Sequence, residues 1–385
     1  MAKFLVSHPA NLDIYGGAEK VCHHVIKTLL AHGQSVELIT FDFDQQRYEE
    51  IMGEEFPKNV VIHSLPAKIE VKPPFTVYKR RRNINSLING LKETIHDYDY
   101  LFSTQYFSAF EGKLLNKGKK NIAYVHFPEI HFEYENLGPK RKAYLWMYKR
   151  WLDKEISRLD LIFCNSNYTK EAVEKYWKKS GTKGPIVVYP PVELKSFWCK
   201  KPLEARSQRV AYLGRFIGTK RHEIMKKLAI ELPQFEFISI GGLRDSEKQW
   251  FEIFSKELPS NYTLRPNIGT SEVAELLCDS RVYCHLMEGE HFGIAPIEAL
   301  ASGCVTLVHN SGGSGEFIPE TFRWNNIEEL KQKIILWSNS PSSSKTWETD
   351  RQQLWERIST LKSENFESTI WHHVDALMRQ AGSKK

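Results

Sequence analysis

The stretch Glu288-Gly289-Glu290-His291-Phe292-Gly293-Ile294-Ala295-Pro296-Ile297-Glu298 is the most informative part of the chain. The apolar run 282–287 before it predicts a buried strand, and Pro296 suits the first turn of a helix that ends near Gly303. Two carboxylates, Glu290 and Glu298, therefore flank a turn from strand to helix. In an open α/β sheet such turns line the ligand crevice at the carboxyl ends of the strands. We expect both carboxylates to face a polar ligand.

Strand-like runs alternate with amphipathic stretches along the whole chain, which predicts an α/β fold with parallel sheets covered by helices. The first series of runs is 3–8, 35–41, 98–103, 120–125, 159–165 and 185–189. The second series is 209–214, 235–240, 262–265, 282–287 and 305–308. A polar stretch at 190–207 separates the two series, and 385 residues exceed what one hydrophobic core usually supports.

The sequence therefore predicts two Rossmann-like domains, residues 1–190 and 191–361, followed by a C-terminal helix at 362–385. Residues 337–346, with Pro341 and a serine run, predict a loop before the last helical stretch.

The composition is that of a soluble globular protein, with 41% apolar and 26% charged residues and a net charge of +6. No segment approaches the roughly 20 apolar residues of a membrane span. The N-terminus enters a strand pattern without a cleavage site, so we expect a cytoplasmic chain. Six cysteines, at positions 22, 164, 199, 278, 284 and 304, form no CxxC pair and are expected to be reduced.

The Glu290–Glu298 spacing around Phe292-Gly293-Ile294 resembles the signature of glycosyltransferase family 4, retaining enzymes of the GT-B fold. The resemblance implies an N-terminal acceptor domain and a C-terminal nucleotide-sugar domain, facing each other across a cleft. It also implies that the last helix, 362–385, crosses back to the N-terminal domain. It implies that Glu290 contacts the donor sugar, that Glu298 binds the ribose hydroxyls, and that 291–294 contribute to the donor site. These four loop residues are His291, Phe292, Gly293 and Ile294.

A carboxylate suits both roles because it only accepts hydrogen bonds and can hold two neighbouring hydroxyls. The alternative is structural. Glu298 would then complement a helix N-terminus, and Glu290 would be a solvated loop charge.

Two cations follow the predicted strand 209–214. Arg215 and Lys220 come directly after Gly214 and beside the start of a helix, where free backbone N–H groups favour an anion. In family 4 the same arrangement neutralises the diphosphate of the leaving nucleotide, whereas ordinary surface charges are the alternative. The later run 309–316, with three glycines, offers exposed amides that can approach a phosphate or sugar.

The N-terminal half carries three further candidates. Gly16 and Gly17 link the first strand to a helix and resemble the family's Gly-Gly turn near the reaction centre. A tight turn that needs positive φ is the other interpretation of these glycines. His126 ends the run 120–125, where the family has a histidine close to the transferred sugar. We therefore expect the catalytic set to be His126, Glu290, Gly16 and Gly17.

Five segments resemble the dolichol-linked-oligosaccharide α-1,2-mannosyltransferases within this family: 124–128, 165–169, 188–192, 290–294 and 309–313. The resemblance implies GDP-mannose as donor and a saccharide or lipid-linked saccharide as acceptor. It implies no cofactor and no metal, because cations of the protein neutralise the diphosphate.

Two basic, aromatic segments bear on the acceptor, 75–82 and 140–151. Anionic headgroups attract Lys and Arg, and Trp and Tyr favour the membrane boundary, so peripheral docking on the cytoplasmic face of a membrane is one hypothesis. An ordinary amphipathic helix packed on the N-terminal domain is the other. We expect no nucleic-acid partner, because no recognised binding module accompanies these charges.

Other functions are compatible with the sequence. Asp42-Phe43-Asp44 could form the metal site of a GT-A transferase. A UDP-sugar-dependent transferase, a nucleotide-sugar epimerase or a non-catalytic sugar-nucleotide-binding protein would use the same fold. The favoured prediction is a retaining, metal-independent mannosyltransferase.

Overall fold

The chain divides into two compact units in the computed structural model. The structure describes residues 1–385 except 11, 13–15, 67–70, 92–94, 96, 106, 108–110, 112–113, 115–118, 179–183, 340 and 383–385. Unit 1 comprises Met1–Pro191 and Ser363–Lys385, and unit 2 comprises Val192–Lys362. The divisions expected from the sequence are 190/191 and 361/362. Each unit is a Rossmann-like α/β domain, so the predicted fold class is confirmed.

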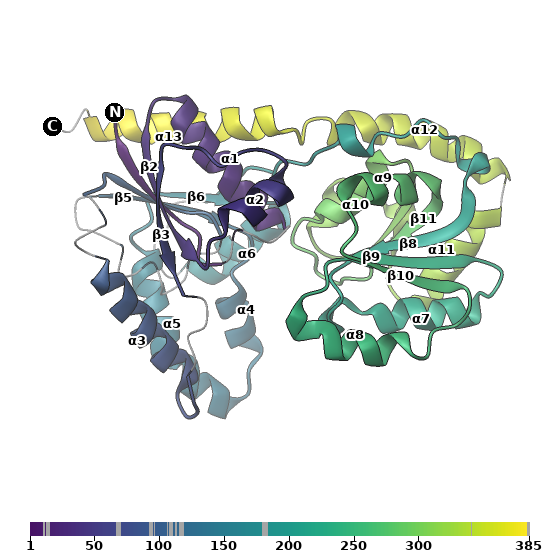
Figure 1. Ribbon diagram of the computed structural model, residues 1–385, viewed down its shortest axis with the longest axis horizontal. Coiled ribbons are helices and arrows are strands. Elements are labelled where there is room, and N and C mark those ends of the chain that lie inside the picture. Colours follow the sequence, from purple (N-terminus) through teal and green to yellow (C-terminus); the bar gives the residue numbers. More distant parts are fainter. Residues whose placement is uncertain are drawn as a thin grey trace. The chain divides into compact units, whose positions relative to one another are not determined.

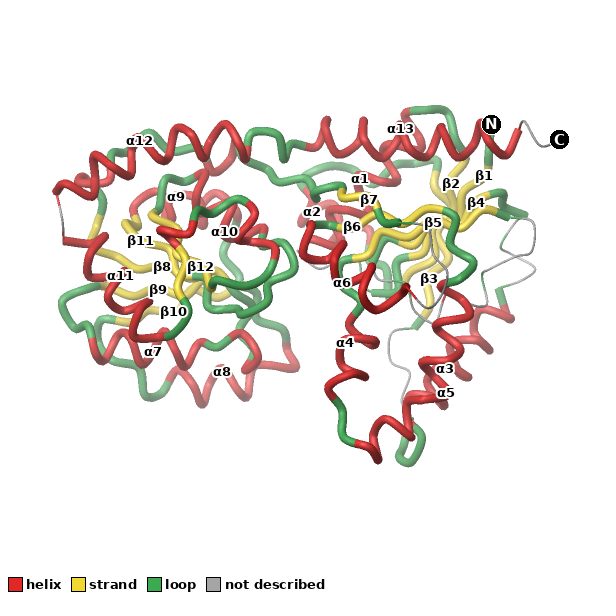
Figure 2. The backbone as a smooth tube through the Cα atoms, turned by 180° about the vertical axis from the view of Figure 1, so that it is seen from behind, coloured by secondary structure: helices red, strands yellow, loops and turns green. Residues whose placement is uncertain are grey.

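Unit 1 is built on one seven-stranded sheet with the order β3-β2-β1-β4-β5-β6-β7 (Figures 1 and 2). Its described strand pairs are all parallel. The strands are β1 (Lys3–Ser7), β2 (Ser35–Phe41), β3 (Val60–Leu65), β4 (Tyr100–Ser103), β5 (Lys120–Val125), β6 (Leu161–Cys164) and β7 (Ile186–Val187). The helices are α1 (Gly17–Ala31), α2 (Gln45–Met52), α3 (Thr76–Gly90), α4 (Glu129–Asn136), α5 (Pro139–Ile156), α6 (Asn167–Trp177) and α13 (Ser363–Gly382).

Both faces of this sheet are buried, because successive side chains of a strand point to opposite faces. In β1, Phe4 and Val6 join a core with α1 and α13, whereas Leu5 joins a core with α3. A third cluster packs β5 and β6 against α5 and α6. The near-continuous apolar runs of the sequence follow from this two-sided burial.

The last helix belongs to unit 1 and lies along α1, as Figure 1 shows in yellow and purple. Its apolar side, Phe366, Ile370, Val374 and Leu377, joins the same core as α1. At the edge of this contact, His24 Nδ1 lies 2.7 Å from Glu367 Oε1. This helix therefore completes the core of a domain whose other elements lie more than 170 residues earlier in the chain.

Unit 2 repeats the design with a six-stranded sheet, β10-β9-β8-β11-β12-β13, whose described pairs are also parallel. Its strands are β8 (Ser207–Leu213), β9 (Glu236–Gly241), β10 (Tyr262–Pro266), β11 (Ser280–Cys284), β12 (Val305–His309) and β13 (Arg323–Trp324). Its helices are α7 (His222–Glu231), α8 (Lys248–Ser255), α9 (Thr270–Asp279), α10 (Ile294–Ala301), α11 (Ile327–Asn339) and α12 (Pro341–Ile358).

The structure corrects three details of the sequence analysis. Strands β3 and β13 were not predicted: β3 has exposed positions that weaken its apolar pattern, and β13 is only two residues long. The predicted loop at 337–346 is wrong, because α11 runs to Asn339 and α12 begins at Pro341. Proline fits there because the first helical turn needs no N–H from it.

The prediction that all six cysteines are reduced is also wrong. Cys199 and Cys278 form a disulfide within unit 2, with a Cα–Cα distance of 5.7 Å. They are 79 residues apart in sequence, and only the packing of the segment before β8 against α9 brings them together. The other four cysteines are buried and free.

None of the helices in the described part of the chain is long and apolar enough to cross a membrane.

The packing of α13 generates a stability prediction. Ile370 is fully buried in the core shared with α1, so Ile370→Ala should lower the free energy of unfolding by about 2–5 kcal/mol. Urea unfolding of the full chain measures this change. The exposed His372 on the same helix is the control, and its replacement by Ala should cost less than about 0.5 kcal/mol. Equal effects of the two substitutions would show that α13 does not stabilise unit 1.

Candidate functional site

Three loops of unit 2 leave the carboxyl ends of neighbouring strands. The loop 214–221 follows β8, the loop 285–293 follows β11, and the loop 310–313 follows β12. Strand order changes direction between β8 and β11, and ligands of doubly wound sheets bind at this switch point. Most of the predicted donor-binding residues lie in these loops.

The carboxylate of Glu290 is held by a histidine that the sequence analysis missed. His285 Nε2 lies 3.0 Å from Glu290 Oε2, and the hydroxyl of Tyr283 lies 3.3 Å from His285 Nδ1. Glu290 Oε1 accepts a hydrogen bond of 3.1 Å from the backbone N–H of His291. His285 is almost fully buried, whereas 22% of the Glu290 side chain is exposed. These hydrogen bonds thus fix the carboxylate, while part of the Glu290 side chain stays exposed to solvent.

Electrostatics keeps Glu290 ionised. Burial by itself would raise its pKa, but the hydrogen bond from His285 and the charges of His285, Lys220 and His291 lower the pKa to about 2. Burial lowers the pKa of His291. The charge of Glu290 opposes this shift, and the charge of Lys220 adds to it. The structure therefore brings together Lys220, Glu290 and His291 from two loops.

The cation-bearing loop begins at Gly214 and ends at Lys220, in a short 3₁₀ turn at Gly218–Lys220. The Arg215 side chain is exposed, and its carbonyl lies 3.0 Å from His222 Nε2. The buried hydroxyl of Tyr212 donates a hydrogen bond of 2.7 Å to the carbonyl of Lys220. The β8 strand thus holds the loop through its own tyrosine.

Arg221 joins this loop to the loop of Glu290. Its backbone is left-handed (φ 57°), an uncommon conformation for a side chain of this size, and it caps α7. Its guanidinium donates a hydrogen bond of 2.6 Å to Glu288 Oε1 and one of 3.3 Å to the carbonyl of Leu286. The sequence gives no signal for this role, because the partner lies 67 residues away.

Two glycines, Gly312 and Gly293, allow the backbone to pass close to Glu290. Gly312 has φ 87°, and a Cβ there would lie 2.3 Å from the carbonyl oxygen of Glu290. That carbonyl accepts a hydrogen bond of 2.7 Å from the N–H of Gly313. Gly293 has φ 95° and precedes α10. The glycine run after β12 therefore supports the Glu290 loop through its backbone.

The other predicted donor residues lie in α10 or just before it. Glu298 lies within this helix and is only 5% exposed, so it is a buried carboxylate. The ring of Phe292 is 3% exposed and lies 5.7 Å from the ring of Phe317, which makes it a core residue. Ile294 is half-buried and begins the helix.

In unit 1, His126 follows β5 directly and is half-buried. Its Nε2 lies 3.3 Å from the carbonyl of Thr104, the residue after β4. His8, which follows β1 and was missed from sequence, lies 3.1 Å from the hydroxyl of Thr104 through Nδ1. Burial, with a smaller effect of His126, lowers the pKa of His8 to about 3, so this histidine is neutral. Thr104 thus links the histidines that follow β1 and β5, the strands on either side of β4.

The positive-φ interpretation of Gly16 and Gly17 is wrong. Gly16 precedes α1 in an extended conformation (φ −166°), and Gly17 is the first helical residue. A Cβ on Gly16 would lie 2.3 Å from a carboxylate oxygen of Glu19. Those atoms are the flexible end of a side chain, so lack of space does not by itself require a glycine here.

One aspartate of the GT-A alternative has a structural role. Asp44 caps α2 by accepting a hydrogen bond of 3.1 Å from the N–H of Arg47. Among the described residues, no three His, Cys, Asp or Glu side chains form a group that could hold a metal ion.

The low pKa of Glu290 generates a prediction about acid stability. A carboxylate whose pKa falls from the ordinary 4.5 to about 2 on folding stabilises the protein above pH 4.5, and this contribution is lost as the pH falls towards 2. Glu290→Gln should therefore lower the free energy of unfolding by about 2–3 kcal/mol at pH 6 and by progressively less below pH 4.5. Urea unfolding at several pH values measures the difference. The exposed Glu275, changed to Gln, should have a small effect at every pH. A pH-independent loss in Glu290→Gln would contradict the assignment.

The close approach of Gly312 generates a second prediction. Gly312→Ala should lower the free energy of unfolding by about 2–4 kcal/mol, because the added methyl meets the Glu290 backbone at an unfavourable φ. The control is Gly269→Ala, since a Cβ at Gly269 meets no atom within 4 Å and its φ is −73°. Thermal unfolding of both variants tests the difference. A neutral Gly312→Ala would mean that the two loops do not meet as described.

Known proteins resemble the chain over both units. The family model of Glycosyltransferase Family 4 matches residues 15–195, and that of Glycosyl transferases group 1 matches residues 198–353. Similar curated proteins include the enzymes named GDP-Man:Man(3)GlcNAc(2)-PP-Dol alpha-1,2-mannosyltransferase from Xenopus laevis and Homo sapiens. The Xenopus laevis enzyme is 26% identical over 226 residues, 49% of this chain and 46% of the relative. The human enzyme is 27% identical over 173 residues, 40% of this chain and 35% of the relative.

The chain therefore spans less than half the length of these relatives. Solved structures share its fold over nearly the whole chain. Sucrose-phosphate synthase from Thermosynechococcus elongatus has a TM-score of 0.74 at 16% identity and covers 100% of both chains. Anabaena HepE in complex with UDP and glucose has a TM-score of 0.71 at 14% identity and covers 98% of this chain and 100% of its own. Because the two family models together match most of both units, the chain belongs to the GT-B glycosyltransferases of family 4 and group 1.

Proposed function

We propose that the chain is a retaining glycosyltransferase that moves mannose from GDP-mannose to a saccharide or lipid-linked saccharide. One observation carries the proposal. At the switch point of unit 2, an ionised Glu290 held by His285 lies within the electrostatic reach of Lys220. A fixed acceptor of hydrogen bonds beside a cation suits a ligand that has both hydroxyls and phosphates.

The donor is proposed to bind with its diphosphate at the loop 214–220. Arg215, Lys220 and the N–H groups at the start of α7 neutralise the charge that develops as the bond from sugar to phosphate breaks. Glu290 holds hydroxyls of the sugar, with His291 beside it. Glu298, buried in α10, holds the ribose hydroxyls, and Gly214, Gly293 and Ile294 shape the backbone of the site.

The relatives support the choice of sugar. Their names specify GDP-mannose as donor and a dolichol-diphosphate oligosaccharide as acceptor.

Unit 1 is proposed to supply the acceptor side of the reaction. His126, with Gly16 and Gly17, would contact the reacting sugar, and the acceptor hydroxyl attacks the face that the leaving diphosphate vacates. Retention of configuration follows from that geometry. The proposal needs no cofactor and no metal, because protein cations neutralise the leaving group. It includes a peripheral position on an anionic membrane surface, through the basic and aromatic α3 and α5.

A donor panel tests the proposal. GDP-mannose at 100 times its dissociation constant should stabilise the chain by about 2.7 kcal/mol, whereas UDP-, ADP- and CMP-sugars should have little effect. Lys220→Ala should remove this stabilisation and lower kcat by about 10²–10³-fold, because a cation at the leaving diphosphate is lost. Lys227→Ala is the matched control, since this lysine is 65% exposed on α7. Mannosyl transfer to a lipid-linked saccharide should continue in excess EDTA.

The alternatives give different results in the same assay. If a UDP-sugar stabilises the chain and GDP-mannose does not, the donor is a UDP-sugar. Product that forms without any acceptor would indicate an epimerase, and donor binding without turnover would indicate a binding protein. Loss of activity in EDTA with recovery on adding a divalent cation would overturn the metal-independent mechanism.

A further inference from the structure

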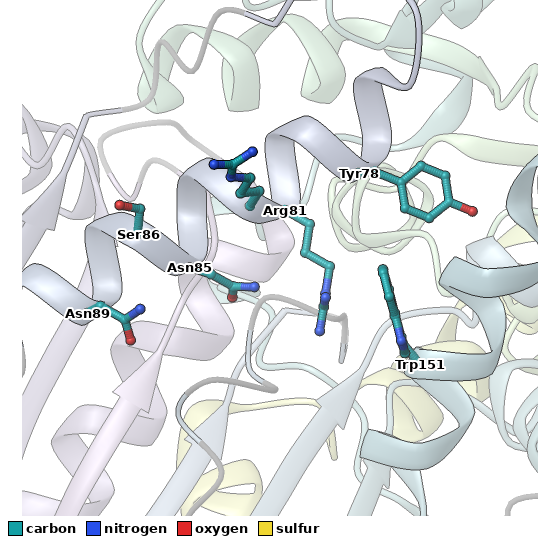
Figure 3. Close-up of a pocket in the computed structure, with 7 residues that line it drawn as sticks. Tyr78, Arg81, Asn85, Ser86, Asn89 and Trp151 are labelled. Atoms are coloured by element: carbon teal, nitrogen blue, oxygen red, sulfur yellow. The ribbon is translucent and has the colours of Figure 1, made fainter.

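A cavity of about 470 Å³ lies between α3 and α5 of unit 1, on the opposite side of α3 from the sheet core. Figure 3 shows Arg81, Asn85 and Asn89 following one another along α3, with Tyr78 and Arg81 extending towards Trp151 of α5. This spacing of three to four residues places them on one face of the helix. The opposite face, with Ile84 and Ile88, is buried against the sheet. The sequence predicted helices here but no cavity between them.

The two helices concentrate positive charge around this cavity. Thr76–Gly90 and Pro139–Ile156 contain ten Lys and Arg and two acidic residues, Asp153 and Glu155, although the net charge of the whole chain is only +6. Lys149 pairs with Asp153 at 2.8 Å. Among the described residues, Arg81 and Arg82 in the cavity wall have no acidic partner within 4.0 Å. An anion is the ligand that this potential attracts.

Two side chains of the cavity wall, Arg81 and Asn85, each carry a buried polar atom that the described residues do not satisfy. The guanidinium of Arg81 lies over the ring of Trp151, 4.2 Å from its centroid, which fixes its direction. Arg81 Nε is buried and has no hydrogen-bond partner, and the same holds for Asn85 Oδ1. Buried polar groups are normally paired. An arginine N–H needs an acceptor such as a phosphate oxygen, whereas an amide oxygen needs a donor such as a hydroxyl.

Exposed aromatic and apolar side chains lie on the same helix pair. Phe75, at the start of α3, is 57% exposed and lies 6.1 Å from the ring of Tyr144. Tyr144 contacts Tyr78, a residue of the cavity wall, at 5.5 Å. On α5, Trp146 is 52% exposed and Met147 is 44% exposed. Figures 1 and 2 show α3 and α5 side by side, projecting away from the sheet of unit 1. Such side chains favour a lipid boundary over a nucleic-acid backbone.

We propose that the α3–α5 cavity binds the phosphate ester of a polyol headgroup carried by a membrane lipid. Arg81 and Arg82 contact the phosphate, Asn85 and Asn89 contact hydroxyls of the headgroup, and Phe75, Trp146 and Met147 enter the lipid boundary. The inference rests on the proposed membrane position of unit 1 and adds a specific lipid site to it. It is independent of donor binding, which involves unit 2.

Vesicle binding by the full chain tests the site. Phosphatidylcholine vesicles are prepared with equal mole fractions of phosphatidylinositol or phosphatidylserine, which carry the same charge but differ in their hydroxyls. The wild-type chain should bind the phosphatidylinositol vesicles about tenfold more tightly. Arg81→Lys with Arg82→Lys keeps the charge and removes the planar guanidinium fork, so this variant should lose the preference. Arg80→Lys with Arg141→Lys changes exposed arginines outside the cavity and should keep it.

Asn85→Asp provides a second variant if the lysine variant is unstable, because a carboxylate at this position repels the phosphate and should also abolish the preference. Equal binding to both vesicles, or equal losses in the cavity and control variants, would overturn the proposal in favour of general electrostatics. Binding of soluble glycerol 3-phosphate without any vesicle binding would overturn the lipid assignment, as would displacement of the vesicles by single-stranded RNA. Stabilisation by GDP-mannose should be unchanged in the cavity variant. If GDP-mannose does not stabilise even the wild-type chain, the donor proposal fails, and the vesicle result still decides the lipid site.

Discussion

The parallel pairing of the strands is the constraint on which the arrangement of both units depends. Because neighbouring strands run in the same direction, the loops that leave their carboxyl ends emerge at one edge of each sheet. In unit 2 this edge collects Lys220, Glu290 and Gly312 from three loops. In unit 1 it collects His8, Thr104 and His126. Polar side chains that are far apart in sequence therefore share one site in each domain.

Within unit 2, the Glu290 carboxylate shows how such a site is held together. A carboxylate in a largely enclosed position would become neutral without nearby charge, because burial disfavours the ionised form. His285 behind it and Lys220 beside it reverse this effect. Arg221 bridges the two loops through Glu288, and Gly312 allows the third loop to pass within hydrogen-bonding distance of the Glu290 backbone. Backbone contacts therefore hold Glu290 in place, and neighbouring charges keep its carboxylate ionised.

Unit 1 combines a buried sheet with a polar helix pair. α1 and α13 share one core with the strands, and α3 and α5 contribute to the cores of the opposite face. The remaining surface of α3 and α5 is basic and aromatic, and the stacking of Arg81 on Trp151 leaves a polar cavity between the helices. Peripheral attachment and acceptor recognition are proposed for this unit, whereas donor recognition is proposed for unit 2.

Local pattern was enough to predict the α/β class, most of the strands, and the position of Glu290, Lys220 and His126 after strands. These features depend on neighbouring residues: apolar runs, prolines at helix starts and polar residues at strand ends. Contacts between distant segments had no such signal. The Cys199–Cys278 disulfide, the support of Glu290 by His285, the left-handed Arg221 and the cavity at Arg81 each require a partner that chain folding brings near. Side-chain orientation and burial arise from packing in three dimensions, and linear spacing does not specify them.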